Sequence, residues 1–302
     1  MENAMLTVRN LRFAYDEYLL FDDLSLSLPA GKITALIGAN GAGKSTLMNC
    51  IAGTQHPFSG DIIVDGMTYA QEGNQIRRSI GYLPDNFGLF PQLTARQHLE
   101  YAAAAQQQKN ANAIEQAIAV TDLAELLDKL PTALSRGQRQ RVGIAMTLVH
   151  QPRFILLDEP ASGLDPVARS ALSQLLKELA ATGATLLVSS HILTELRDYA
   201  THYIIMDKGR IIRNGDLSDS LQWRLTVTEA GAQQRSLELL ASSEVGSEVS
   251  HLRLEGESIY FSLPATENSS DLLRQLIMAD IAVAEFTRIG TDIEQLYQQS
   301  IQ

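Results

Sequence analysis

The feature that most constrains this chain is a glycine-rich run, GANGAGKS at residues 38–45, which directly follows an apolar run at residues 33–37. The glycine-rich run fits the pattern G-x-x-x-x-G-K-S/T at every position. A short, nearly continuous apolar run is typical of a strand buried on both faces. In such a loop the backbone N–H groups point at phosphate oxygens, and the dipole of the following helix adds to that field. The alternative is a loop that serves only as a turn.

The loop and the start of the next helix supply the expected nucleotide contacts. Lys44 is expected to bridge the β- and γ-phosphates and to assist catalysis, and the Ser45 hydroxyl is expected to bind Mg²⁺. The contact set is Gly38, Ala39, Asn40, Gly41, Ala42, Gly43, Lys44, Ser45 and Thr46.

Further apolar runs predict that strands and helices alternate. The predicted strands are residues 6–8, 24–28, 33–37, 154–157 and 185–188. Between the last two, Asp165 is placed to N-cap a helix with Pro166 at its first position and Gly183 after its end. Its expected apolar stripe consists of Val167, Leu172, Leu175, Leu176 and Leu179. Strands separated by helices predict an α/β fold with a parallel sheet.

Two carboxylates, Asp158 and Glu159, follow the apolar run at 154–157. Ligands of open parallel sheets bind outside the carboxyl ends of the strands, so this pair is expected beside the phosphate loop. Asp158 would hold Mg²⁺, and Glu159 would orient and polarise the attacking water. The alternative is an acidic strand end that caps the following turn.

The segment LSRGQ at residues 134–138 contains a capping-box pattern, with Ser135 followed three residues later by Gln138. A helix N-terminus with a hydroxyl and the bare backbone of Gly137 is suited to phosphate. Taken alone, such a pattern often marks only the start of a helix.

Composition limits the class of protein. The 302 residues carry a net charge of −11, which argues against a general nucleic-acid binder, and the single cysteine excludes a disulfide framework. Cys50 is interpreted as a small core residue. No apolar run is long enough to span a bilayer, and the first residues do not resemble a signal peptide, so we expect a cytoplasmic chain.

A charge shift predicts two domains, residues 1–221 and 222–302. The second contains 12 acidic residues, five arginines and no lysine, a balance of −7. Its expected strands are residues 225–227, 259–263 and 281–283, with a helix at 271–277, which together suggest a small α+β domain.

In their order along the chain, these motifs resemble an ABC transporter ATP-binding cassette over about residues 6–215. The resemblance implies a P-loop NTPase fold with a parallel core sheet, an antiparallel β subdomain and a helical subdomain. It also implies that Ser135 and Gly137, with Gln138 in the same contact set, reach the γ-phosphate of an ATP held mainly by a second cassette. Two cassettes would then close head-to-tail on two nucleotides.

Three more residues take roles from this resemblance. Tyr15, 29 residues before Lys44, matches the aromatic that stacks on adenine, with Tyr18 as a competitor and an ordinary strand aromatic as the alternative. Asp165 matches a residue that communicates with the partner cassette. His191 matches the histidine that contacts the γ-phosphate, since it lies just beyond a predicted strand; a lone histidine is otherwise a surface or core residue.

Two positions depart from the family pattern. Asp85 stands where the family usually has a glutamine that meets Mg²⁺ and the attacking water; its carboxylate is a metal ligand, but it lacks an amide donor. Arg136 stands where the commonest form of the signature has glycine. It leaves Ser135 and Gly137 intact and adds positive charge near an expected anion.

The resemblance implies the ATP-binding and ATP-hydrolysing subunit of an ABC transporter, with Mg-ATP as cofactor. Its partners would be a second cassette, identical or different, and separate integral-membrane permease subunits on whose cytoplasmic face it would lie. Residues 285–297 resemble the extension of cassettes that serve export-type permeases, which favours export. The alternative is a soluble ABC-type ATPase that acts on translation or DNA; the acidic charge and the single cassette argue against it.

Overall fold

The computed structural model describes residues 4–108, 110, 112–192, 196–217, 222–228, 231–241, 249–263, 269–289 and 297. Contacts divide the chain into two compact units, the first ending at Asn214 and the second beginning at Gly215. The charge shift places the boundary slightly later, at 221/222, and residues 218–221 lie outside the described set. None of the helices among the described residues is long and apolar enough to cross a bilayer.

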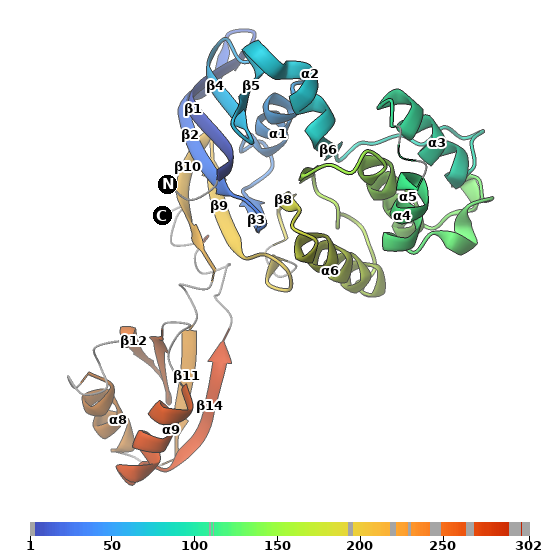
Figure 1. The fold of residues 1–302 in the computed structure, drawn as a ribbon. Coiled ribbons are helices and arrows are strands. Elements are labelled where there is room, and N and C mark those ends of the chain that lie inside the picture. The colour runs from blue at the N-terminus through green and yellow to red at the C-terminus, as the bar shows by residue number, and fades with distance from the viewer. Residues whose placement is uncertain are drawn as a thin grey trace. The chain divides into compact units, whose positions relative to one another are not determined.

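An antiparallel sheet in the order β2-β1-β4-β5 forms one layer of the first unit (Figure 1). Its strands are β1 (Ala4–Tyr15), β2 (Tyr18–Pro29), β4 (Ser59–Val64) and β5 (Met67–Thr68). The first two are far longer than the expected strands at 6–8 and 24–28, because β1 and β2 form a hairpin that pairs along its whole length up to Tyr15 and Tyr18.

A six-stranded sheet in the order β10-β9-β3-β8-β7-β6 forms the second layer. Its strands are β3 (Ile33–Ile37), β6 (Ile80–Leu83), β7 (Phe154–Leu157), β8 (Thr185–Ser190), β9 (His202–Asp207) and β10 (Arg210–Asp216). The expected parallel arrangement is confirmed, since β3 pairs parallel with both β8 and β9, and β7 pairs parallel with both β8 and β6. Two of these strands, β3 and β7, have the predicted bounds, whereas β8 runs two residues further, to Ser190.

Six α-helices complete the described part of the first unit. They are α1 (Lys44–Ala52), α2 (Tyr69–Ser79), α3 (Ala95–Ala105), α4 (Ala113–Val120), α5 (Arg136–Leu148) and α6 (Pro166–Ala181). Helices α3, α4 and α5 contact one another and form a helical group beside the sheet (Figure 1). Short 3-10 turns at Ala124–Leu126 and Pro131–Ala133 lead into α5.

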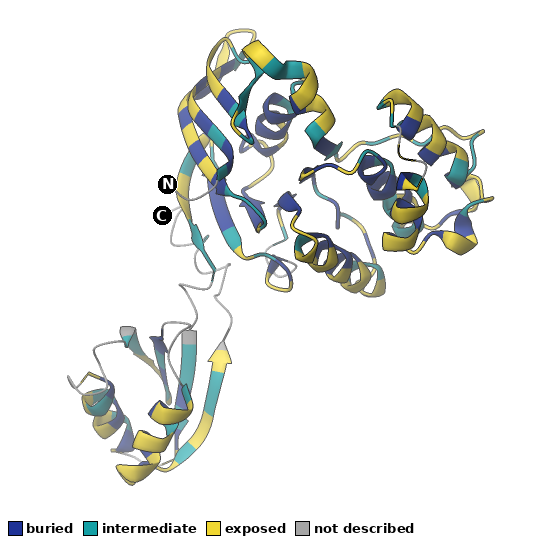
Figure 2. Cartoon of the chain, viewed as in Figure 1, coloured by how far each residue is buried: buried dark blue, intermediate teal, exposed yellow. Residues whose placement is uncertain are grey.

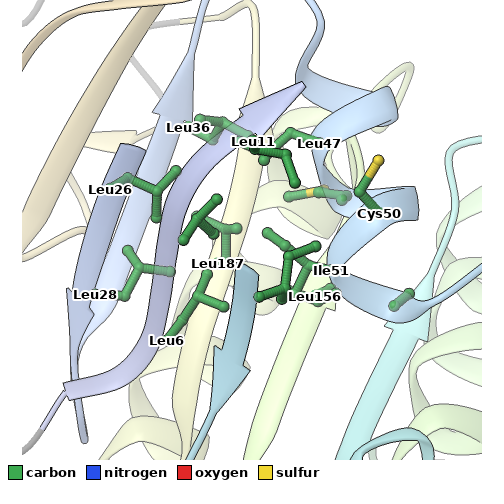
Figure 3. Close-up of a cluster of buried hydrophobic side chains, with 14 of the residues drawn as sticks. Leu6, Leu11, Leu26, Leu28, Leu36, Leu47, Cys50, Ile51, Leu156 and Leu187 are labelled. Carbon is green, nitrogen blue, oxygen red and sulfur yellow. The ribbon is translucent and has the colours of Figure 1, made fainter. Parts of the chain in front are cut away.

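The main core joins both sheets through helix α1. Leu6 and Leu28 from the antiparallel sheet, Leu47 and Ile51 from α1, and Leu156 from β7 belong to one buried cluster (Figure 3). Buried residues line the facing surfaces of these layers (Figure 2). The phosphate-loop helix is therefore fixed from both sides by hydrophobic contact, which holds the loop in front of it in place.

Helix α6 has the predicted N-cap, because Asp165 Oδ1 accepts a hydrogen bond from the Ala168 N–H at 2.8 Å. Its predicted stripe is wrong at one position. Leu172, Leu175, Leu176 and Leu179 are buried, but Val167 is 80% exposed. Val167 is the second residue of the helix, where the chain has only begun to approach the sheet. Its spacing from the four leucines therefore matches the apolar stripe, but the side chain is left uncovered.

The second unit has the order of elements β11-α8-β12-β13-α9-β14 and an antiparallel sheet in the order β12-β13-β11-β14. This is the ferredoxin-like βαββαβ arrangement. Its elements are β11 (Gln222–Val227), α8 (Ala232–Ala241), β12 (Ser250–Glu255), β13 (Ser258–Ser262), α9 (Ser269–Met278) and β14 (Val283–Ile289).

Sequence reasoning found only part of this second unit. Strands β11 and β13 and helix α9 match predicted elements, but α8 and β12 were not predicted. The expected strand at 281–283 is wrong in its bounds, because β14 begins only at Val283. Of the stretch 285–297 that resembles an export-type extension, residues 290–296 lie outside the described residues.

The exposure of α6 predicts a contrast between two substitutions in the same helix. Leu176→Ala should lower the free energy of unfolding by about 2–5 kcal/mol, because Leu176 is fully buried and its removal leaves a cavity. Val167→Ala, the matched control, should change it by less than about 0.5 kcal/mol. Urea unfolding of both variants measures the difference, and equal losses would contradict this packing.

Burial also predicts that Cys50 is unreactive. Desolvation raises the pKa of this thiol to about 12, and the side chain is 1% exposed, so thiolate is scarce and enclosed at pH 8. The folded protein should react with a thiol reagent such as DTNB only as fast as it opens, and rapidly in denaturant. Fast labelling of the native protein would show that the core around α1 is open.

Candidate functional site

The loop between β3 and α1 has the conformation that phosphate binding requires. Gly41 and Gly43 have φ angles of +84° and +105°, in the region that favours glycine. A Cβ atom at Gly43 would lie 2.8 Å from the Phe21 ring, so space as well as backbone angle requires glycine there. Gly43 is the N-cap of α1 and no side chain caps the helix, which leaves its first N–H groups available to an anion.

Lys44 lies folded along this loop and is almost buried, with 6% of its surface exposed. Its Nζ donates a hydrogen bond to Gly38 O at 2.8 Å and lies 3.4 Å from Glu159 Oε1. The ammonium group therefore connects the phosphate loop to the carboxyl end of β7.

Asp158 and Glu159 are organised by Ser189, a residue that sequence reasoning missed. The Ser189 hydroxyl donates to Asp158 Oδ1 at 2.5 Å and accepts from the Glu159 N–H at 2.8 Å. Ser189 can do this because β7 and β8 are parallel neighbours in which Leu157 pairs with Val188, so the next residues also lie side by side. The only sequence signal was a polar residue at the end of an apolar strand.

Glu159 is held between two groups predicted for the site. Its Oε2 is 2.7 Å from His191 Nδ1, whereas its buried Oε1 has no hydrogen bond and only the 3.4 Å ion pair with Lys44 Nζ. Glu159 also has a φ of +50°, a conformation that places it in the sharp turn after β7. A carboxylate oxygen that is buried without a hydrogen bond is unusual in a folded protein and suits a position where water or a ligand is bound.

Asp85 follows β6 and lies at the same edge of the sheet. Partial burial and the carboxylates of Asp158 and Glu159 raise its pKa, while Arg136 and His191 act in the opposite direction. Asp85 and Glu159 line a common cleft of about 280 Å³ together with Arg136. Within the described residues the Asp85 carboxylate has no hydrogen bond or ion pair, so it is available to a ligand.

Ser135, Gly137 and Gln138 lie in a different place. The predicted capping box is confirmed, because the Gln138 N–H donates to Ser135 Oγ at 3.2 Å and the Ser135 N–H donates to Gln138 Oε1 at 2.9 Å. All three line a pocket of about 670 Å³ between α5 and α6, and Asp165 lines it too. No phosphate-loop residue lines that pocket.

Tyr15 is tied to the phosphate-loop helix. Its hydroxyl lies 3.1 Å from Thr46 Oγ1 and 3.1 Å from Gln55 Oε1, and its ring remains 44% exposed. Tyr18 is 62% exposed and makes no such bond. The exposed ring fixed at α1 makes Tyr15 the better placed of the two for a base stacked beside the loop.

These residues fit Mg-ATP. The available N–H groups of α1 and the Lys44 ammonium suit phosphates, and Ser45 and Asp158 offer oxygen ligands to the metal. Among the described residues no three His, Cys, Asp or Glu side chains gather into a metal site. Mg²⁺ in nucleotide sites binds through one or two protein oxygens together with substrate phosphates and water.

The family model described as "ABC transporter" matches residues 21–162. The Fe(3+) ions import ATP-binding protein FbpC of Haemophilus influenzae (strain 86-028NP) is 36% identical over 230 residues, 74% of this chain and 65% of that protein. Other import proteins are matched over 58–64% of their length, so the chain spans less than two thirds of these relatives.

Two further similarities cover nearly the whole of the other protein. The lipopolysaccharide export system ATP-binding protein LptB of Haemophilus influenzae (strain ATCC 51907) is 33% identical, over 70% of this chain and 90% of that protein. The dimeric ATP-binding cassette MJ0796 in a post-hydrolysis state with ADP and Pi has a TM-score of 0.63 at 26% identity, over 70% of this chain and 99% of that one. With the P-loop fold, the antiparallel layer and the helical group already described, the chain belongs to the ATP-binding proteins of the ABC transporter family.

Proposed function

We propose that this chain is the ATP-binding and ATP-hydrolysing subunit of an ABC transporter. The observation that carries the proposal is the position of Glu159, held 2.7 Å from His191 Nδ1 and 3.4 Å from Lys44 Nζ beside a phosphate loop with available N–H groups. Phosphoryl transfer depends mainly on positioning and charge stabilisation, and this arrangement supplies both.

Each residue of the site has a proposed role. Lys44 and the loop N–H groups bind the β- and γ-phosphates, while Ser45 and Asp158, with Asp85 nearby, hold Mg²⁺. Glu159 orients and polarises the attacking water, and its Oε1, which has no hydrogen bond, is the free acceptor for that water. The metal, when bound, neutralises charge that develops on the transferred phosphate.

His191 and Ser189 fix the carboxylates in this scheme. His191 holds Glu159 by one oxygen and leaves the other for the water, and its side chain is 42% exposed and so accessible to a γ-phosphate. Ser189 keeps Asp158 next to the Glu159 backbone. Tyr15 stacks on adenine above α1.

The LSRGQ residues Ser135, Gly137 and Gln138 act on the nucleotide of a second cassette, and Asp165 lies beside them to communicate with that partner. Their position in a pocket that no phosphate-loop residue lines supports this arrangement. The dimeric state of the related cassette MJ0796 supports it as well.

Separate membrane subunits complete the proposed transporter, with the cassette on the cytoplasmic face of the membrane. We propose export as its direction and residues 222–302 as an accessory domain. LptB is an export protein, and the match covers 90% of the length of LptB. FbpC, in contrast, is an import protein. Identification of the membrane proteins that copurify with the chain, followed by uptake and efflux assays, tests partner and direction.

Glu159→Gln should abolish most hydrolysis without loss of ATP binding. The amide keeps the shape of the side chain but loses its charge and cannot polarise water, so ATP turnover should fall by a factor of about 100 or more. ATP-bound dimers should accumulate and be visible by gel filtration with Mg-ATP. Lys44→Ala, the control, should lose ATP binding itself, and near-normal turnover by the Glu159 variant would remove it from this role.

Deletion of residues 222–302 should leave nucleotide binding intact. The first unit has its own core and contains every proposed nucleotide ligand, so the Kd for Mg-ATP should change by less than about threefold while dimerisation or regulation changes. Titration with a fluorescent ATP analogue and gel filtration measure the two properties. Loss of ATP binding by a truncated chain that is still folded would show that the accessory assignment is wrong.

A further inference from the structure

The two residues that depart from the family pattern, Asp85 and Arg136, line one cleft. They belong to segments about fifty residues apart, the first after β6 and the second at the first position of α5. The cleft of about 280 Å³ that they share also contains Glu159 and Ser162. Two unusual residues that meet at one place suggest a joint reason for both.

The guanidinium of Arg136 lies over the loop that follows Glu159. A Cβ atom placed on Gly163 would collide with its terminal nitrogens, so the Arg136 side chain packs directly against the Gly163 backbone. Within the described residues this side chain has no direct hydrogen bond or ion pair. Arg139, the other arginine of the cleft, instead donates to the carbonyl oxygens of Leu134 and Pro131 at 2.9 and 3.4 Å. Arg136 is thus the cation that remains available to the cleft.

Charge gives the physical reason for the pair. With glutamine and glycine at positions 85 and 136, the charged residues of the cleft would be Glu159 and Arg139, with Asp158 next to Glu159 in the chain. Asp85 adds a third carboxylate where a polyanion is expected to bind, which is unfavourable. Arg136 restores the net charge of the cleft. It acts to lower the pKa of Asp85, whereas the two neighbouring carboxylates, Asp158 and Glu159, raise it.

We propose that Asp85 and Arg136 form a charge-compensating pair in which Arg136, whose side chain packs against the loop after Glu159, offsets the carboxylate of Asp85 and so permits nucleotide to bind. The inference rests on the proposed function, because it concerns Mg-ATP at the same site. It assigns Arg136 a role within its own chain, whereas Ser135 and Gly137 on either side of it serve the partner cassette.

A double-mutant cycle on the full chain tests the pair. Arg136→Gly removes the positive charge that offsets Asp85, so the Kd for Mg-ATP should rise about tenfold, and less in 0.5 M salt, which screens charge. Asp85→Gln leaves an excess cation and should lower the Kd while it reduces turnover. The double variant should return the Kd to within about threefold of the wild type.

A lysine variant and a control cycle separate charge from structure. Arg136→Lys should recover most of the affinity lost in Arg136→Gly, because it keeps the charge. The control cycle uses Arg96 and Glu115, an exposed ion pair at 2.9 Å on the helical group. Arg96→Gln and Glu115→Gln should each change the Kd for Mg-ATP very little, and their effects should add. Thermal melting confirms that each variant is folded.

Each outcome decides a separate point. The pair would be overturned if the effects of Asp85→Gln and Arg136→Gly on the Kd simply add. It would also be overturned if neither Arg136→Lys nor salt relieves the loss of affinity in Arg136→Gly. In both cases the ATPase assignment stands. A wild-type chain that binds no Mg-ATP, or binds it as well after Lys44→Ala, would overturn the proposed function instead.

Discussion

The parallel register of three strands is the constraint on which the site depends. Because β3 pairs with β8 and β8 pairs with β7, their carboxyl ends lie at one edge of the sheet. That edge receives the phosphate loop from β3, Asp158 and Glu159 from β7, and Ser189 and His191 from β8. A shift of one residue between β7 and β8 would separate Ser189 from the Asp158 carboxylate and the Glu159 N–H and turn the side chains to the opposite face.

Buried charge at this edge costs stability. Lys44 and Glu159 are 6% and 13% exposed and meet at 3.4 Å without a hydrogen bond between them, a geometry that recovers little of the cost of removing two ions from water. The cost is tolerated because the core around α1 joins two sheets and is held by fully buried leucines. The ordinary hydrophobic layers thus support a polar arrangement suited to bind an anion and a metal.

The sequence and the structure agree best where local chemistry decides the outcome. Capping residues act within three positions of themselves, so Ser135 and Asp165 were found as N-caps without any tertiary information. Val167 and strand β12 show the opposite case. The periodicity that marks a buried face says nothing about whether a neighbour covers it, and β12 belongs to the sheet only through its pairing with β13.

The sequence by itself determined the phosphate loop, the strand that precedes it, the carboxylates after β7 and the family, because each depends on residues that are adjacent in the chain. Only the tertiary structure decided that Ser189 bridges Asp158 and Glu159, that Glu159 keeps one oxygen without a hydrogen bond, and that Arg136 shares a cleft with Asp85. These contacts join residues at least 30 positions apart, and they arise from strand pairing and helix packing. No local pattern in the sequence records that register.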